Sequence, residues 1–255
     1  MESIKELRKI CQETRDDVLY QRNWFDRHVT RRISIHITRV FLRLGISANQ
    51  ATLVDLLIGL GAGALFTLAS PAAWFGGIAL FYLYFVFDCV DGEIARYRRT
   101  SSPTGSYLDG GLGVLMWPYV LACMTFGINA TLGSTLVFAF GFLAALGWLL
   151  YTASALFPYP ILHALGRLPE VVDTAGPIKE PWPMALGRAV FGTRGFIPAM
   201  LLVTAVDAAV GTFAAGTVAL NARFVYLAVF ALATLAGITL RTRGVMKHGV
   251  RLEKP

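Results

Sequence analysis

The chain has 255 residues, of which 55% are hydrophobic and only 15% are charged, and its mean hydropathy is +0.57. This composition excludes an ordinary soluble domain and predicts a protein that crosses a membrane several times. The formal net charge of +7 does not indicate a nucleic-acid partner, because the cations lie beside apolar runs and form no basic stripe interleaved with aromatic residues.

The N-terminal segment, residues 1–49, is charged, so we expect an amphipathic helix and not a cleavable signal peptide. Apolar residues recur at helical spacing from Ile33 to Leu44, and arginines flank them. This pattern is typical of a helix that lies in the headgroup plane of a membrane, with an ordinary helix packed on protein as the alternative. Gly45 is placed to end this helix, and Ser47 or Asn49 to cap the next one.

Six apolar runs follow, and each is close to the roughly 20 residues that a helix needs to cross the hydrocarbon. Each run predicts a helix, because lipid leaves the backbone no other open structure with its polar groups satisfied. The predicted spans are residues 50–70, 72–90, 108–128, 134–157, 196–218 and 224–240. The sequence therefore predicts an all-α polytopic membrane protein, with an interfacial segment (1–49), a six-helix transmembrane domain (50–241) and a basic cytoplasmic tail (242–255).

The positions of the basic residues predict the orientation in the membrane. Arg223 is the only one of the 23 Lys and Arg residues outside the N-terminal segment, the loop after the second span, the long loop at 158–194 and the residues after Leu240. Because cytoplasmic loops are enriched in Lys and Arg, we expect both termini and the loop after the second span on the cytoplasmic side.

An acidic motif, Asp-Cys-Val-Asp-Gly-Glu-Ile-Ala-Arg, runs from Asp88 to Arg96 at the end of the second span. Asp88 and Asp91 are three residues apart, so a helix puts both carboxylates on one face, where they repel each other. A cation offsets that repulsion, and oxygen ligands without nearby His or paired Cys favour Mg²⁺ or Mn²⁺, with Asp109 completing the site. Arg96 adds a planar fork suited to phosphate oxygens. The pattern indicates a metal-diphosphate site; solvated acids paired with nearby arginines are the alternative.

These residues resemble the signature of the CDP-alcohol phosphatidyltransferase family, Asp-x2-Asp-Gly-x2-Ala-Arg-x8-Gly-x3-Asp-x3-Asp. The matching residues are Asp88, Asp91, Gly92, Ala95, Arg96, Gly105 and Asp109. The resemblance implies transfer of a phosphatidyl or other phospho-alcohol group from a CDP-linked donor, such as CDP-diacylglycerol, to the hydroxyl of a second alcohol, with release of CMP. It further implies a role in phospholipid or related polar-lipid synthesis and an acceptor that can itself be phosphorylated. The expected cofactors are two Mg²⁺ or Mn²⁺ ions, and the expected assembly is a homodimer in contact with membrane lipids.

The resemblance assigns expected roles in two groups within the transmembrane catalytic domain. The expected catalytic metal ligands are Asp88, Asp91 and Asp109. The residues expected around the CDP moiety are Asn49, Thr52, Gly92, Ala95, Arg96 and Gly105. In this second group the small residues would admit the cytidine, the arginine would hold the diphosphate, and the two residues of the first span would close the pocket.

One position departs from the signature, because its last Asp falls on Gly113. In the family that acid is the proposed general base and a metal ligand, and loss of a general base commonly lowers a rate by ~10²–10⁴-fold. Asp55 or direct activation by the metal are the preferred replacements, with Glu93 as a weaker candidate. Gly113 also leaves open a catalytically impaired family member that binds CDP-alcohols or partner proteins, or a site enlarged for a bulkier acceptor.

Other polar residues in or near the spans have less defined roles. Asp207 falls within the fifth predicted span, where it either lines a cavity or makes a structural hydrogen bond. Four arginines near cytoplasmic span ends are candidates for holding a phosphorylated acceptor, with interfacial anchoring as the alternative. They are Arg188, Arg194, Arg241 and Arg243. A secondary transporter is disfavoured, because the acids gather at one end of the spans and no related halves are visible.

Overall fold

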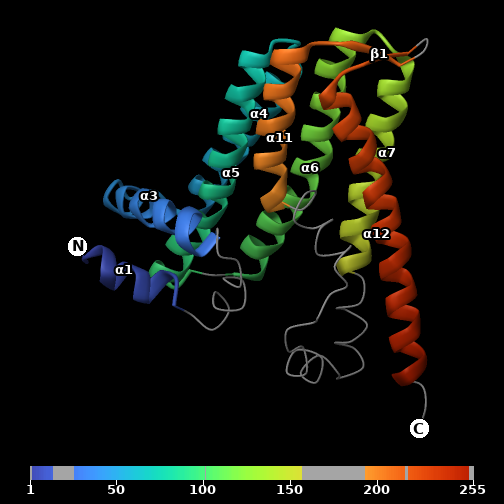
Figure 1. Ribbon diagram of the computed structural model, residues 1–255. Helices are drawn as coiled ribbons and strands as arrows, with labels where there is room; N and C mark the ends of the chain where they lie inside the picture. The colour runs from blue at the N-terminus through green and yellow to red at the C-terminus, as the bar shows by residue number, and fades with distance from the viewer. Residues whose placement is uncertain (1, 14–25, 101, 157–192, 216–217, 253–255) are drawn as a thin grey trace. The chain divides into compact units, whose positions relative to one another are not determined.

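Helices dominate the computed structural model, which describes residues 2–13, 26–100, 102–156, 193–215 and 218–252 (Figure 1). Contacts within the chain define two compact units, Met1–Met116 and Trp117–Pro255, with the boundary inside helix α6. The elements of the first unit are α1 (Ile4–Cys11), the π-helical turn η1 (Asp26–Thr30), α3 (Arg31–Arg43), α4 (Ala48–Phe66), α5 (Pro71–Arg98) and the first part of α6 (Pro103–Leu132). The second unit holds the rest of α6, α7 (Thr135–Leu156), α11 (Thr193–Val210), β1 (Phe213–Ala215), β2 (Val218–Leu220) and α12 (Ala222–Leu252).

The all-α membrane class is confirmed. Among the described residues, five helical segments are long and apolar enough to cross a membrane, and the apolar segment Gly195–Val210 is shorter. The five segments are Ala48–Phe66, Pro71–Arg98, Asp109–Leu132, Thr135–Ser154 and Ala222–Leu240. The protein is therefore a multi-pass integral membrane protein.

Local chemistry fixes the entry into the first membrane helix. Gly45 adopts a positive φ of 74° just after α3, the left-handed conformation that glycine favours at helix ends. Ser47 then caps α4 through a capping box, in which its hydroxyl accepts from the Gln50 N–H and the Gln50 carboxamide accepts from the Ser47 N–H. The structure thus selects Ser47 and not Asn49 as the cap.

Helix α5 is longer than its apolar run. The predicted second span ends at residue 90, whereas α5 continues to Arg98 and stops at Arg99, which has a positive φ of 55°. Hydropathy marks the edge of the lipid and not the end of the helix, because backbone hydrogen bonds continue into the polar region. At 28 residues α5 is about 42 Å long, longer than the roughly 30 Å hydrocarbon layer. The acidic motif therefore lies inside a rigid helix.

The first unit is built around α5. Helix α4 packs along α5, and α1 and α3 lie across the end of α5 that carries the motif (Figure 1). Ile35 of α3 packs with Leu7 and Cys11 of α1 in a buried cluster. A second cluster joins Ala51 of α4 to Val90 and Ile94 of α5, with partly buried residues of α3 against it. The N-terminal helices are therefore part of the core of this unit.

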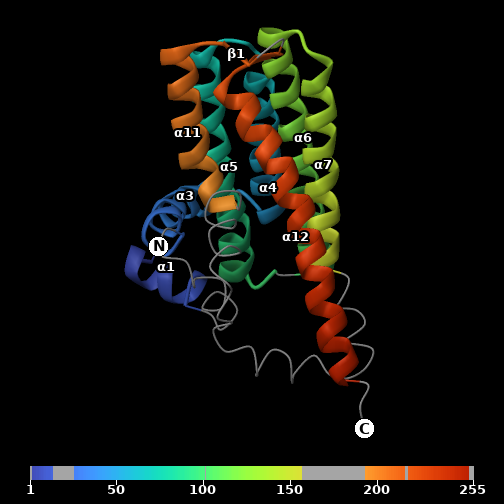
Figure 2. The same cartoon turned by 45° about the vertical axis from the view of Figure 1, so that its right-hand side comes forward.

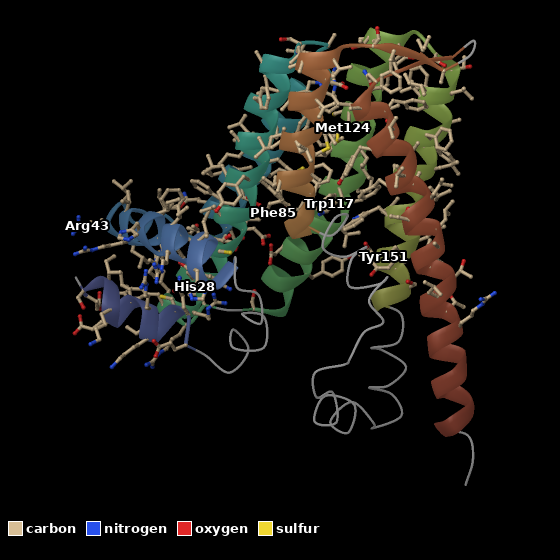
Figure 3. The ribbon with its side chains drawn as sticks, in the orientation of Figure 1. His28, Arg43, Phe85, Trp117, Met124 and Tyr151 are labelled. Atoms are coloured by element: carbon tan, nitrogen blue, oxygen red, sulfur yellow. The ribbon has the colours of Figure 1, made fainter. Side chains whose placement is uncertain are left out.

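In the second unit, α12 runs along α7 (Figure 2). The close approach depends on Gly147, because a Cβ there would clash with the Thr234 hydroxyl. Trp117 stacks on Trp148 with ring centroids 4.4 Å apart; Trp117 and Tyr151 are labelled in Figure 3.

The predicted fifth span, 196–218, is wrong at its end: α11 stops at Val210, and Gly211 takes a positive φ of 69°. A small antiparallel pair, β1 with β2, follows in the register Phe213↔Leu220.

Asp207 forms a buried ion pair in the second unit. It lies in the last turn of α11, where it accepts from the Arg223 Nε and from the Ala222 N–H at the start of α12. Asp207 is 6% exposed and Arg223 is 3% exposed. This contact ties α11 to α12 across the β1–β2 pair, and it gives a structural role to the one basic residue outside the predicted cytoplasmic segments.

This ion pair predicts a specific pattern of stability. Arg223→Met or Asp207→Leu alone leaves one buried charge without its partner, so each should lower the free energy of unfolding by about 3–5 kcal/mol. The double variant should recover most of that loss, because an apolar pair needs no desolvation of charge. Thermal unfolding of the detergent-purified protein measures the effect, with the exposed Arg243→Met as control. A double variant less stable than both single variants would contradict the assignment.

Candidate active site

Three helices bring four carboxylates together in the first unit. Asp55 comes from α4, Asp88 and Asp91 from α5, and Asp109 from the second turn of α6. Asp55 lies within electrostatic range of the other three, and Asp109 lies within range of both acids of α5. In Figure 3 the labelled Phe85 marks the stretch of α5 just before this cluster. The structure therefore gathers the three expected metal ligands with the preferred candidate base.

Asp91 is held by α4 and by its own backbone. Its Oδ2 accepts from the Thr52 hydroxyl at 2.6 Å, and its Oδ1 accepts from the Gly92 N–H at 2.5 Å. The residue is 5% exposed. Thr52 thus orients a carboxylate directly, whereas Asn49, in the first turn of α4, is exposed.

Asp55 is buried and incompletely paired. It is 5% exposed, and within the described part of the chain its Oδ1 has no hydrogen-bond partner. A buried carboxylate oxygen without a donor is destabilising by about 1–3 kcal/mol or more, so its presence among three other acids points to a missing cationic or proton-donating partner. Asp88 is exposed and Asp109 is half-buried, so a ligand can reach both carboxylates from outside the packed helices α4 and α5.

The chemistry of this cluster fits a divalent cation. All four groups are hard oxygen ligands, which suit Mg²⁺ or Mn²⁺, and the unpaired Asp55 oxygen is a further available donor. As the side chains stand, no three Asp, Glu, His or Cys groups in the described ranges lie close enough to hold one ion. Carboxylates that repel each other turn apart, so binding requires them to rotate toward the ion.

Arg96 lies beside the acids over Gly92. Its Nε donates to the Cys11 carbonyl at 2.7 Å, and a Cβ at Gly92 would lie 3.3 Å from the Arg96 Nη1. Glycine at this position therefore makes room for the guanidinium, a role that the sequence did not reveal. Ala95 is half-buried on the same helix, and the Gly105 N–H is bound by the Ser102 hydroxyl in the first turn of α6.

Glu93 faces away from this cluster and is fully engaged. It is completely buried, and both of its carboxylate oxygens accept hydrogen bonds from the N-terminal segment. The donors are Gln12, Arg31, Ser34 and Thr38. Sequence reasoning missed these supporting residues, although the polar pair Ser34 and Thr38, one turn apart on an otherwise amphipathic helix, is a recognisable signal.

Gly113 lies one turn after Asp109 on α6. The only heavy atom within 4 Å of a Cβ built there is the Tyr84 Oη, at 3.9 Å, among the described residues that the comparison covers. A Cβ therefore fits at this position without a clash. Tyr84 of α5 is a second residue that the motif did not identify.

Most of the expected acceptor arginines fall outside the described side chains. Arg188 lies outside the described residues. Arg194 and Arg241 lie in α11 and α12, but only their backbone is described, and Arg243 is exposed.

A membrane-embedded carboxylate cluster with an adjacent arginine defines a class of site suited to metal-assisted phosphoryl chemistry. Residues 46–170 match the model of the CDP-alcohol phosphatidyltransferase family, and this part of the chain is a CDP-alcohol phosphatidyltransferase domain. The chain is also 34% identical over 122 residues to the bifunctional IPC transferase and DIPP synthase of Thermococcus kodakarensis. That match covers 48% of this chain and 26% of the relative, so the chain spans about a quarter of the length of that protein. Together these findings show a CDP-alcohol phosphatidyltransferase domain at residues 46–170, which is about half of the chain.

Proposed function

We propose that this protein transfers a phosphatidyl or other phospho-alcohol group from a CDP-linked donor to the hydroxyl of a second alcohol and releases CMP. The observation that carries the proposal is the collection of four carboxylates from three helices, with one buried oxygen unpaired. The family domain supports a CDP-alcohol donor and an alcohol acceptor in general terms. CDP-diacylglycerol is the donor class that we would test first.

In this proposal the acids bind the metal ions and the arginine binds the diphosphate. Asp88, Asp91 and Asp109 hold Mg²⁺ or Mn²⁺, and Thr52 keeps Asp91 in position. When bound, the ions would neutralise the charge that develops on the departing CMP. Arg96 contacts the diphosphate with the edge of its guanidinium that does not face Cys11.

Asp55 is the proposed general base. The acceptor oxygen forms a bond to the phosphorus that carries the donor alcohol, and the bond from that phosphorus to the bridging oxygen of CMP breaks. The acceptor proton passes to the Asp55 Oδ1, which has no donor among the described residues. Glu93 is not assigned this role, because four donors already occupy its oxygens.

The orientation and assembly follow as further parts of the proposal. The basic segments support a site and both termini on the cytoplasmic side, where a water-soluble CMP can leave. The family resemblance supports a homodimer. The absence of the last signature acid at Gly113 favours, as a second candidate, a member that binds CDP-alcohols without turnover.

A CMP-release assay tests the central part of the proposal. Detergent-purified protein with CDP-diacylglycerol, Mg²⁺ or Mn²⁺ and a panel of alcohols should release CMP, and chelation of the metal should stop the reaction. Asp91→Asn should lower the rate by roughly 10²–10³-fold, because it removes charge from the metal site. Glu13→Gln, at an exposed acid of the N-terminal segment, should have no effect. Tight CDP-diacylglycerol binding with no CMP release from any alcohol would favour the second candidate.

Gly113→Asp tests the departure from the family signature. Among the described residues, the added Cβ would have only the Tyr84 hydroxyl within 4 Å, at 3.9 Å, so the variant should fold with an unchanged melting temperature. It supplies a fourth acid of the signature and should raise kcat, by up to the ~10²-fold that a general base contributes. In an Asp55→Asn background the same substitution should restore activity. No gain in either background would contradict the assignment of Asp55 and position 113 to one catalytic role.

A further inference from the structure

Glu93 is fully paired by described residues, yet the proposed reaction does not use it. Its Oε1 accepts from Gln12 Nε2 at 2.7 Å and from Ser34 Oγ at 2.6 Å. Arg31 Nη1 lies 3.3 Å from the same oxygen, and Thr38 Oγ1 donates to Oε2 at 2.6 Å. Four side chains from two separate stretches of the N-terminal segment therefore converge on one residue of α5.

This network determines where the end of α1 lies. Gln12 directly follows α1, and its side chain bridges Glu93 and the Arg31 carbonyl, which it contacts at 2.9 Å. Leu7 and Cys11 of α1 are completely buried against Ile35 of α3. The carboxyl end of α1 is thus fixed against α5 by both polar and apolar contacts.

The same end of α1 holds Arg96. The Cys11 carbonyl accepts from the Arg96 Nε at 2.7 Å, so the cation lies at the negative end of the α1 dipole. With Nε held, the Nη1 edge of the guanidinium lies over Gly92, next to Asp91. Arg96 and Glu93 are three residues apart on α5, so one helix carries both the anchor and the arginine that it places.

We propose that Glu93 is a positioning residue for Arg96. It holds the Gln12 end of α1, α1 presents the Cys11 carbonyl, and that carbonyl fixes the guanidinium in the orientation that meets the diphosphate of a CDP-linked ligand. This inference rests on the proposed role of Arg96 in the function above. Stability alone does not explain a fully buried carboxylate here, because apolar residues of similar volume commonly serve packing as well or better.

A double-mutant cycle on CDP binding separates positioning from simple structural support. Glu93→Leu should weaken the binding of CDP, in the presence of Mg²⁺, by about tenfold, the effect of losing one hydrogen bond to a charged group. In an Arg96→Gln background the same substitution should have almost no further effect. Glu93→Gln, which keeps a carbonyl for Gln12 and Ser34, should retain most of the affinity, and Glu13→Gln is the matched control. Isothermal titration calorimetry of this chain in detergent gives the dissociation constants.

The outcomes distinguish this inference from the proposed function. Equal losses from Glu93→Leu in the wild-type and Arg96→Gln backgrounds would overturn the positioning role and leave the proposed function standing. A wild-type protein that binds no CDP would overturn the proposed function and this inference with it. If Glu93→Leu does not fold, Gln12→Leu takes its place in the cycle, because it removes one donor and leaves the charge of Glu93 paired with Arg31.

Discussion

Like charges held close together at the edge of a low-dielectric layer are the constraint on which the rest of the site depends. Asp55, Asp88, Asp91 and Asp109 come from three helices and lie within range of one another's charge. Thr52 and the Gly92 backbone stabilise one of them, and Asp55 keeps an unpaired buried oxygen. Such an arrangement is costly unless a cation or a substrate proton completes it. The cluster is therefore most simply understood as the protein's part of a binding site for a cation and a substrate.

The N-terminal segment fixes two arginines whose charges reach the cluster, with Arg31 acting on Asp88 and Arg96 acting on Asp91. Arg31 pairs with Glu93, and Arg96 donates through its Nε to the Cys11 carbonyl. In this arrangement one face of α5 binds its own chain through Glu93, and the other presents acids toward α4 and α6. Two carboxylates only two residues apart, Asp91 and Glu93, thus have opposite roles, and the difference comes entirely from which helices pack against each face.

Much of the fold could be predicted because it depends on local properties of the sequence. Hydropathy located the five long apolar helices of the described residues, and the φ of Gly45 and the capping box of Ser47 follow from residue type at helix ends. The motif predicts that Asp88, Asp91 and Asp109 form one site, and in the structure Asp109 lies within range of the charges of both other acids. Hydropathy does not show where a helix ends, because α5 continues past Val90 to Arg98. The predicted fifth span is too long, because α11 stops at Val210 and Gly211 takes a positive φ. The partners of Glu93 and the Asp207–Arg223 pair depend on tertiary packing, which periodicity does not encode.

The most direct measurement is anomalous diffraction from crystals of this protein grown with Mn²⁺ and a CDP-alcohol. The account predicts manganese peaks bounded by carboxylate oxygens of Asp88, Asp91 and Asp109, with the diphosphate between the metal and Arg96. Electron density for the nucleotide at this position without any anomalous peak among these acids would contradict it.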